Sequence, residues 1–245
     1  MQKTLTPAER LIVAADFKPT TPNGKGWAKA KVLALADSLK GTGVYLKVNS
    51  ALRACGYDLI GEIQSRGLRV FADLKLIDIG ETLSTDGVLI REAKPELLTT
   101  MCVAGLAAMQ ALKAELPDTE VLGVTVLTSM NEEDVQRIFS CRIDEAVLRL
   151  ADVAMVAGID GLISSPKEVE LLRSYVSRSL TLNTPGVRPL WSIVKGDDQN
   201  PNRVMTPTEA IKVGADRIVV GRPITQAENP HDAVMRTIEE IASAM

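Results

Sequence analysis

Short runs of apolar and β-branched residues recur along the chain, and each is followed by a stretch with helical periodicity. Amphipathic stretches such as "WAKAKVLALADSLKG" and "DEAVLRLADVAMVAG" separate these runs, and many of them close on a glycine, as helices often do. The apolar runs predict eight strands, at residues 11–16, 44–48, 68–76, 97–103, 120–128, 161–165, 179–187 and 217–221.

The order of these elements indicates the fold class. Eight strand–helix units within 245 residues match the (β/α)8 barrel, or TIM barrel, of the α/β class. The units leave no linker for a second domain, so residues 1–245 are expected to form a single barrel domain. A doubly wound open sheet is the alternative, but no G-x-G-x-x-G follows the first predicted strand.

The third predicted strand and its continuation, "RVFADLKLIDIGET", carry charges within an apolar run. Alternation places Phe71, Asp73 and Lys75 on one face of the strand, and a second carboxylate, Asp78, follows shortly after. Buried charges need partners or a function. For an isolated D-x-K a structural ion pair is the ordinary interpretation, so the rest of the chain must decide.

Polar residues at other predicted strand ends change this interpretation. The active site of a barrel lies at the C-terminal ends of its strands, so residues at those ends meet at one mouth. The polar and glycine-containing positions there are Asp16, Lys47, Asp73, Lys75, Asp78, Thr128, Ser164, Ser165, Pro185 to Arg188, Gly221 and Arg222. Charged groups from several strands therefore converge, which favours a functional site.

A phosphate site is expected after the seventh and eighth strands, its usual place in such barrels. "VVGRPIT" supplies Gly221, whose missing side chain permits a close backbone approach, and Arg222, a forked donor for phosphate oxygens. "TPGVRP" supplies Arg188, and Gln199 comes from the long stretch that follows. A surface salt bridge is the alternative for Arg188.

The charged cluster also favours a particular chemistry. Lysines and aspartates in one cluster balance each other's charge, and neighbouring carboxylates keep a lysine protonated. A protonated Lys75 is a poor Schiff-base nucleophile but a good general acid. Asp73 beside the reacting centre would repel an anionic substrate group, an arrangement that makes sense if that group is to leave.

Composition narrows the classes of function. The net charge of −3 and the aromatic content of 3% argue against a nucleic-acid partner. His231 is the only histidine, which excludes Ser-His-Asp catalysis and a Cys/His zinc cluster, and we expect it to cap a helix or lie on the surface. Cys55, Cys102 and Cys141 are far apart in sequence, as expected for unpaired thiols in a reducing compartment. Without an apolar leader or an 18-residue apolar run, a cytoplasmic protein with no membrane partner is expected.

Taken together, these residues resemble the orotidine 5′-monophosphate decarboxylase family, whose members catalyse the last step of UMP (pyrimidine) biosynthesis. "DLKLIDIGET" is similar to the D-x-K-x-x-D signature of that family. The likeness continues through "LIVAADF", "YLKVN", "VTVLTSM", "TPGVRP", "GDDQ" and "RVMTPTEAIKVGADRIVVGRPIT". The D-x-K-x-x-D motif is shared with sugar-phosphate lyases of the same barrel superfamily, whereas the lysine of "YLKVN" and the "TPGVRP" and "GRPIT" stretches are specific to the decarboxylase.

The resemblance implies decarboxylation of orotidine 5′-monophosphate to UMP with no metal or organic cofactor. Lys47, Asp73, Lys75 and Asp78 would form a charged tetrad, in which Lys75 protonates C6 as carbon dioxide leaves and Asp73 presses against the substrate carboxylate. A homodimer is implied as well, because Asp78 and Thr82 would reach into the neighbouring subunit's site.

The resemblance also implies how the nucleotide is held. Asp16, Lys47 and Asp78 would bind the ribose hydroxyls, and Thr82 and Thr128 would lie near the nucleotide. The 5′-phosphate would be bound by Arg188, Gln199, Arg222 and the Gly221 backbone.

Some positions depart from the family pattern. Ile77 stands where many members have histidine, Asn49 and Gly80 replace a usual glycine and proline, and Met101 and Cys102 alter the fourth strand. Three residues, "NPN", are inserted after Gln199. None of these changes removes a member of the tetrad.

Two rival functions remain open at the level of sequence. One is a metal-dependent sugar-phosphate lyase of the same superfamily, which would require Mg²⁺ and lack the lysine of the second strand, so Lys47 counts against it. The other is a phosphate-ligand-binding barrel without catalysis, which the intact tetrad disfavours. A Schiff-base aldolase using Lys75 is disfavoured because that lysine is expected to be protonated.

Overall fold

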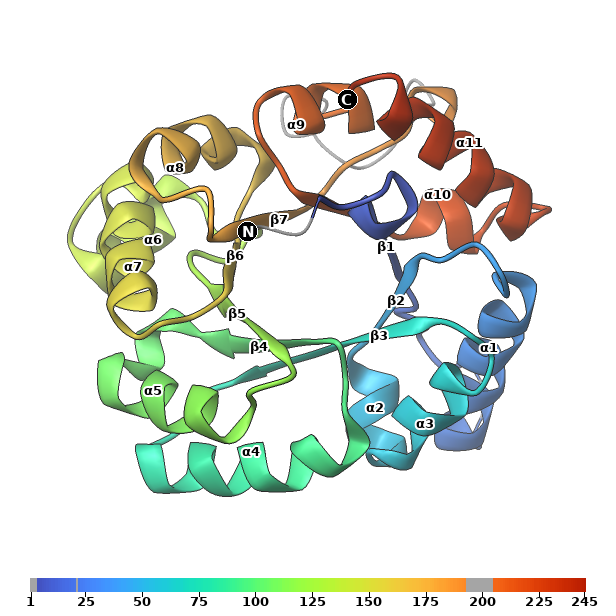
Figure 1. The fold of residues 1–245 in the computed structure, drawn as a ribbon, viewed down its shortest axis with the longest axis horizontal. Coiled ribbons are helices and arrows are strands. Elements are labelled where there is room, and N and C mark those ends of the chain that lie inside the picture. Colours follow the sequence, from blue (N-terminus) through green and yellow to red (C-terminus); the bar gives the residue numbers. More distant parts are fainter. Residues whose placement is uncertain (1–3, 21, 193–204) are drawn as a thin grey trace.

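Eight parallel strands close into a barrel in sequence order, with helices arranged around the outside (Figure 1). The computed structural model describes residues 4–20, 22–192 and 205–245. The strands are β1 (Leu11–Ala14), β2 (Tyr45–Val48), β3 (Arg69–Leu76), β4 (Leu97–Met101), β5 (Glu120–Val124), β6 (Gly161–Ile163), β7 (Thr181–Pro185) and β8 (Arg217–Val220). The predicted (β/α)8 barrel is thereby confirmed.

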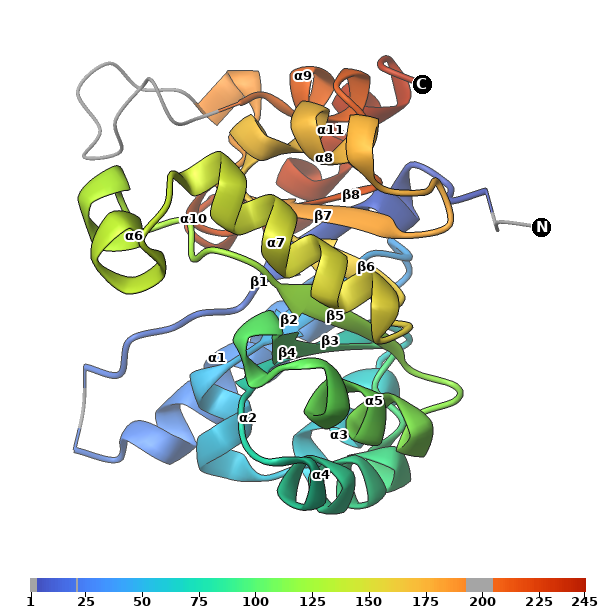
Figure 2. The ribbon, with the colours of Figure 1, turned by 90° about the vertical axis from the view of Figure 1, so that its left-hand side faces the viewer.

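Helices separate successive strands and cover the outer face of the barrel. The α-helices are α1 (Gly24–Ser38), α2 (Ser50–Cys55), α3 (Asp58–Gln64), α4 (Gly80–Ala93), α5 (Leu106–Glu115), α6 (Glu132–Phe139), α7 (Ile143–Val156), α8 (Val169–Tyr175), α9 (Pro207–Lys212), α10 (Arg222–Thr225) and α11 (Pro230–Ala242). Short 3₁₀ helices are η1 (Ala8–Arg10), η2 (Cys102–Ala104), η3 (Pro166–Glu168) and η4 (Leu190–Ser192). In the side view, α6 and the segment that leaves β1 project from the same side of the barrel (Figure 2).

Several strands are shorter than the apolar runs that predicted them. β5 ends at Val124 rather than at residue 128, and β6 ends at Ile163 rather than at residue 165. Residues beyond the end of β5 are also buried, as Val126 is, and this is why the apolar run in the sequence is longer than the strand. Thr128 and Ser164 therefore lie in loops that follow the strands.

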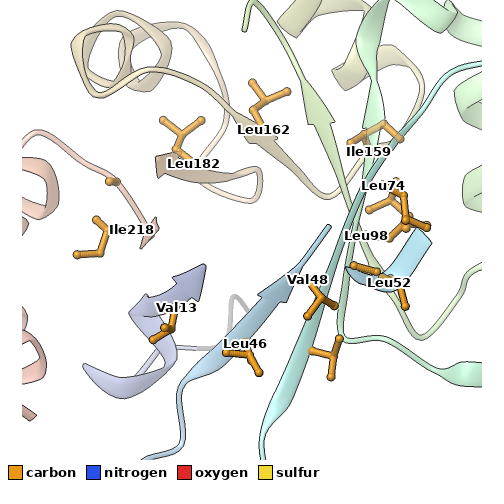
Figure 3. Close-up of a cluster of buried hydrophobic side chains, with 14 of the residues drawn as sticks. Val13, Leu46, Val48, Leu52, Leu74, Leu98, Ile159, Leu162, Leu182 and Ile218 are labelled. Carbon is orange, nitrogen blue, oxygen red and sulfur yellow. The ribbon is translucent and has the colours of Figure 1, made fainter. Parts of the chain in front are cut away.

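Two apolar clusters fill the molecule. One lies inside the barrel and includes Ile12, Phe71 and Leu122, which alternate with outward-facing residues along their strands. The larger cluster joins the outer faces of the strands to the surrounding helices, as Val13, Leu46, Leu98 and Leu182 illustrate (Figure 3). Packing on both faces explains why the strands read as nearly continuous apolar runs.

The histidine and the three cysteines have ordinary structural environments. His231 is exposed in the first turn of α11, whose N-cap is Asn229, so the predicted surface position is confirmed. Cys102 and Cys141 are buried, Cys55 is partly buried, and all three are free thiols. Within the described part of the chain, no helix is long and apolar enough to cross a membrane.

Candidate active site

A cavity of about 310 Å³ opens at the C-terminal mouth of the barrel. Strands from around the barrel contribute to it, because the C-terminal ends of parallel strands meet there. The predicted site residues that line it are Asp16, Lys47, Asp73, Lys75, Thr128 and Gly221. With Pro185 and Gly186, which also line it, eight of the residues expected at one mouth are therefore brought together.

The carboxylate of Asp73 is the centre of the charged cluster. Its Oδ2 accepts a hydrogen bond of 3.0 Å from Lys47 Nζ, and its Oδ1 accepts one of 2.6 Å from Lys75 Nζ. Lys47 Nζ also donates to Asp16 Oδ2 at 2.8 Å. The side chains of Lys47 and Asp73 are less than 10% exposed, whereas that of Lys75 is 29% exposed. The cluster thus runs from the interior of the barrel to the cavity.

These contacts determine the charge state of the two buried members. Burial favours the neutral form of Asp73, but the nearby ammonium groups of Lys47 and Lys75 outweigh it and lower the pKa of the carboxyl group. Burial likewise favours neutral Lys47, but the charges of Asp73 and Asp16 outweigh it and raise the pKa of the ammonium group. Asp73 and Lys47 are therefore both ionised near neutral pH.

Lys75 occupies an unusual backbone conformation. Its φ of 49° is in the left-handed region, which non-glycine residues seldom adopt. The pairing of β3 with β4 is irregular between Ala72 and Leu76, so the predicted regular alternation stops short of Lys75. Its ammonium group nevertheless binds Asp73, and the side chain lines the cavity. Backbone strain of this kind clusters at functional sites.

A second cavity, of about 200 Å³, adjoins the first and contains three of the four residues predicted to bind phosphate. Arg188, Gly221 and Arg222 line it, together with Asp16, which belongs to both cavities. Arg188 is buried, and its backbone N–H donates to the carbonyl of Met205 at 2.9 Å. Gln199 lies outside the described residues, so its predicted role stays a prediction.

Two glycines shape the wall between these cavities. Gly186 has a φ of +82° and lines both cavities, so the turn after β7 requires glycine there. A Cβ at Gly221 would lie 3.7 Å from the Cβ of Ala14, an ordinary contact distance. The space around residue 221 would therefore admit a Cβ.

Asp78 and Thr82 are not brought into this constellation. Both are exposed, Asp78 in the connection after β3 and Thr82 in the first turn of α4. Neither belongs to the linings of the two cavities of this chain. The predicted tetrad is thus assembled as three residues, Lys47, Asp73 and Lys75, within one subunit.

Two contacts of Asp73 were not predicted. The hydroxyl of Thr99 donates to Asp73 Oδ1 at 3.0 Å, and Asn49 Nδ2 lies 3.5 Å from Asp73 Oδ2. A polar residue at an inward position of β4, between Leu97 and Met101, was the signal available for Thr99. The departure at Asn49 therefore adds a donor at the edge of the charged cluster.

The departures in β4 have a structural role. Met101 packs against the cluster inside the barrel, and Cys102 is 1% exposed at the start of η2. Burial raises the pKa of the Cys102 thiol to about 12, so it is an unreactive apolar group at neutral pH. No group of three His, Cys, Asp or Glu side chains suited to a metal ion occurs among the described residues.

Comparisons with known proteins agree on one family. The model of the orotidine 5′-phosphate decarboxylase / HUMPS family matches residues 9–237. An orotidine 5′-phosphate decarboxylase of Syntrophus aciditrophicus is 36% identical, over 97% of this chain and 94% of the relative. One of Pseudomonas fluorescens is 38% identical, over 95% and 97%. The crystal structure of the Lactobacillus acidophilus enzyme of that name superposes with a TM-score of 0.78 at 28% identity, covering 95% of this chain and 99% of the other.

Proposed function

The chain belongs to the orotidine 5′-phosphate decarboxylase / HUMPS family and decarboxylates orotidine 5′-monophosphate in pyrimidine biosynthesis, and we propose that its C-terminal cavity is the site of this reaction. The observation that carries the proposal is the cluster of buried Lys47 and Asp73 with partly exposed Lys75, which faces the cavity from β2 and β3. It supplies a cation and an anion at fixed positions beside the space that a pyrimidine would fill.

In the proposed reaction the bond between C6 and the carboxylate breaks, and carbon dioxide leaves. The electron pair stays at C6 and takes a proton from Lys75 Nζ, which regains one from solvent. Before that step, the ammonium group stabilises the negative charge that develops at C6, and it is already oriented by Asp73. The ionised Asp73 repels the substrate carboxylate and thereby favours its departure.

We assign the adjoining cavity to the 5′-phosphate of the substrate. Arg188 and Arg222 supply guanidinium donors there, and Gly186 and Gly221 leave the backbone accessible. Asp16 belongs to both cavities and binds Lys47, so these two residues would contact the ribose between base and phosphate. Binding energy gained at the phosphate would then hold the pyrimidine against the charged cluster.

A homodimer would complete the site with Asp78 and Thr82 of a neighbouring subunit. What supports this is their exposure together with that of nearby apolar side chains. Ile77 and Ile79, which flank Asp78, are 56% and 70% exposed, and Leu89 on α4 is 51% exposed. Large exposed apolar side chains on the same segment as an exposed carboxylate are typical of an interface.

Mixing two inactive variants tests the shared site. Lys75→Ala and Asp78→Ala subunits are each expected to be inactive, and their heterodimer should regain activity because one of its two sites is intact. Lys75→Ala mixed with Lys47→Ala is the matched control: Lys47 and Lys75 both serve the cavity of their own subunit, so each of the two sites of this heterodimer carries one defect and no activity should return. Well-formed heterodimers of the first pair with no activity would contradict the shared site.

The metal-dependent sugar-phosphate lyase is not favoured, since the curated relatives are decarboxylases and Lys47 occupies the cluster. The assay is the loss of ultraviolet absorbance of orotidine 5′-monophosphate with EDTA-treated protein. Turnover without added metal is expected, and turnover that needs Mg²⁺ would contradict the proposal. The cytoplasmic location and the lack of nucleic-acid and membrane partners remain predictions from the sequence.

A further inference from the structure

Thr99 is a fully buried hydroxyl at the centre of β4. It lies between Leu97 and Met101, which both contact the apolar cluster inside the barrel, so its side chain comes from the inward face of the strand. The hydroxyl makes two hydrogen bonds to β3. It donates to Asp73 Oδ1 at 3.0 Å and accepts from the backbone N–H of Lys75 at 2.9 Å.

The second of these bonds replaces a missing bond of the sheet. Ala72 is paired with Leu98, and the next pairing joins Leu76 to Thr100, so three residues of β3 face Thr99 alone. A bulge of this kind leaves backbone groups without ladder partners. At Lys75, where φ is 49°, the backbone N–H donates to the hydroxyl of Thr99 instead of to a backbone carbonyl of β4.

We propose that Thr99 is a positioning residue for the decarboxylation, holding the Lys75 backbone and the Asp73 carboxylate in one fixed relation. The proposal rests on the proposed function of Lys75 and Asp73. Thr99 is absent from the lining of the cavity, so it acts through the other two residues.

The geometry around Asp73 shows what the hydroxyl adds. Oδ2 is bound by Lys47 at 3.0 Å and approached by Asn49 at 3.5 Å, while Oδ1 is bound by Lys75 and Thr99. Without Thr99, Oδ1 keeps the flexible Lys75 side chain as its partner, and the backbone of that same lysine loses its acceptor. Both ends of the Lys75–Asp73 pair then gain freedom, which reduces the preorganisation on which electrostatic catalysis depends.

The test compares three substitutions at residue 99 with a matched change at the next residue. Thr99→Val removes the hydroxyl at nearly constant volume, Thr99→Cys keeps a weak donor, and Thr99→Ser keeps the hydroxyl. Thr100→Val is the control: Thr100 is equally buried and also binds β3, donating to the Leu76 carbonyl at 3.0 Å, but it contacts neither Asp73 nor the Lys75 N–H.

For Thr99→Val we expect kcat to fall about 10- to 100-fold, as for loss of a hydrogen bond to a charged group, with KM nearly unchanged. Thr99→Cys should lie between Val and wild type, and Thr99→Ser and Thr100→Val should stay within about threefold of wild type. If Thr99→Val does not fold, the kcat values of Thr99→Ser and Thr99→Cys still test the proposal, because the first should be close to wild type and the second lower. Equal losses in Thr99→Val and Thr100→Val, or no loss in Thr99→Cys and Thr99→Val, would overturn the proposal.

A measurement without substrate separates this proposal from the proposed function. Carbon-13 NMR follows the titration of the Asp73 carboxyl group, identified by its absence in Asp73→Asn. The charged groups around it are Lys47 from β2, Lys75 from β3 and Asp16 after β1; β4 contributes the uncharged Thr99.

A donor to the ionised carboxylate lowers its pKa, so Asp73 should titrate at a higher pH in Thr99→Val than in wild type or Thr100→Val. An unchanged titration would overturn the positioning role even in an active enzyme. If the titration of Asp73 moves as expected in Thr99→Val but the wild-type protein leaves orotidine 5′-monophosphate unchanged, the proposed function is contradicted instead.

Discussion

The two mouths of the barrel both hold buried charge, but the charges are used differently. At the C-terminal mouth, Lys47 and Lys75 bind Asp73 beside an open cavity. At the N-terminal mouth, Arg217 at the start of β8 and Glu120 at the start of β5 bind each other across the barrel. One network presents an ammonium group to a ligand space. The other pairs the two terminal nitrogens of a guanidinium group with protein oxygens, while Arg217 Nε has no hydrogen-bond partner among the described residues.

The N-terminal network is built from a forked donor with several partners. Arg217 is 3% exposed and binds both carboxylate oxygens of Glu120, at 2.8 and 2.7 Å. It also donates to Asn183 Oδ1 at 3.1 Å, and its guanidinium group lies 5.3 Å from the centre of the Tyr45 ring. A bidentate, stacked arginine of this kind is suited to holding structure rather than to exchanging partners.

This difference between the two charged networks shows that buried charge alone does not identify a catalytic site. The Lys75 ammonium carries three N–H donors, and its hydrogen bond in the described structure goes to Asp73, which leaves donors for a ligand. We therefore expect changes at the C-terminal mouth to alter activity and changes at the N-terminal mouth to alter stability.

The largest expected effect is that of Lys75→Ala on activity. Loss of the general acid and of the fixed cation should lower kcat by about 10⁴-fold or more. Because Asp73 keeps Lys47 and Thr99 as partners, the free energy of unfolding should change by less than about 1 kcal/mol. Steady-state kinetics and urea unfolding on one preparation check both parts, and appreciable residual turnover would rule out Lys75 as the acid.

Arg217→Met should show the opposite pattern. Breaking the buried pair leaves Glu120 without its cation, which typically costs about 3 to 5 kcal/mol and lowers the melting temperature by roughly 6 to 20 °C in a protein of this size. The folded variant should retain wild-type kcat. The double variant Glu120→Gln/Arg217→Met is the control and should recover part of the loss, since no unpaired charge remains; a melting temperature equal to that of wild type in Arg217→Met would contradict the structural role.

A further carboxylate, Glu168, sharpens the comparison because it is buried and forms no ion pair with the residues that the structure describes. Glu168 is 8% exposed and accepts the backbone N–H of Ser165, and burial, together with the charge of Asp144, raises its pKa to about 7. The folded state therefore prefers the protonated form. Its stability should be greatest below the unfolded pKa near 4.5 and should fall by about 3 kcal/mol as pH rises to 7.

Glu168→Gln removes this dependence, so it should be more stable than wild type at pH 8 and no more stable at pH 4.5. Urea unfolding at both pH values measures the difference. Glu209 is the matched control, because it caps its helix in the same way but is exposed, and hydrogen bonds from Thr206 lower its pKa. Glu209→Gln should therefore give no gain at pH 8, and an equal gain in the two variants would refute the explanation from burial.

The smallest effect is expected at the phosphate cavity. Arg222→Ala should lower kcat/KM for orotidine 5′-monophosphate by about 10- to 100-fold, because a charge-assisted hydrogen bond to phosphate is lost. Orotidine, which lacks the phosphate, should react equally slowly with wild type and variant. A matching loss with orotidine would place Arg222 outside the phosphate site.

The sequence predicted one mouth far better than the other, for a physical reason. Lys47, Asp73 and Lys75 stand at the ends of recognisable apolar strands, and the barrel rule alone brings strand ends together. Glu120 and Arg217 are 97 residues apart and resemble ordinary charges before apolar runs, so their pairing depends on how the barrel closes.

Finer features of the active site also escaped the sequence. The left-handed backbone conformation at residue 75 is usually signalled by a glycine, but here the residue is a lysine. The bulge depends on the pairing of β3 with β4. Thr99 is one of two adjacent threonines, and only the inward alternation of β4 separates its role from that of Thr100. Such features depend on contacts between strands, which periodicity does not report.

A single-turnover experiment tests the division between the two mouths most directly. Excess EDTA-treated wild type, Lys75→Ala or Arg217→Met is mixed with orotidine 5′-monophosphate at a temperature at which all three are folded, and the conversion of bound substrate to UMP is followed. Wild type and Arg217→Met should convert it at the same rate, and Lys75→Ala should convert it at least about 10⁴-fold more slowly. Conversion by Lys75→Ala at a rate near that of wild type, or a large loss of rate in folded Arg217→Met, would contradict the account.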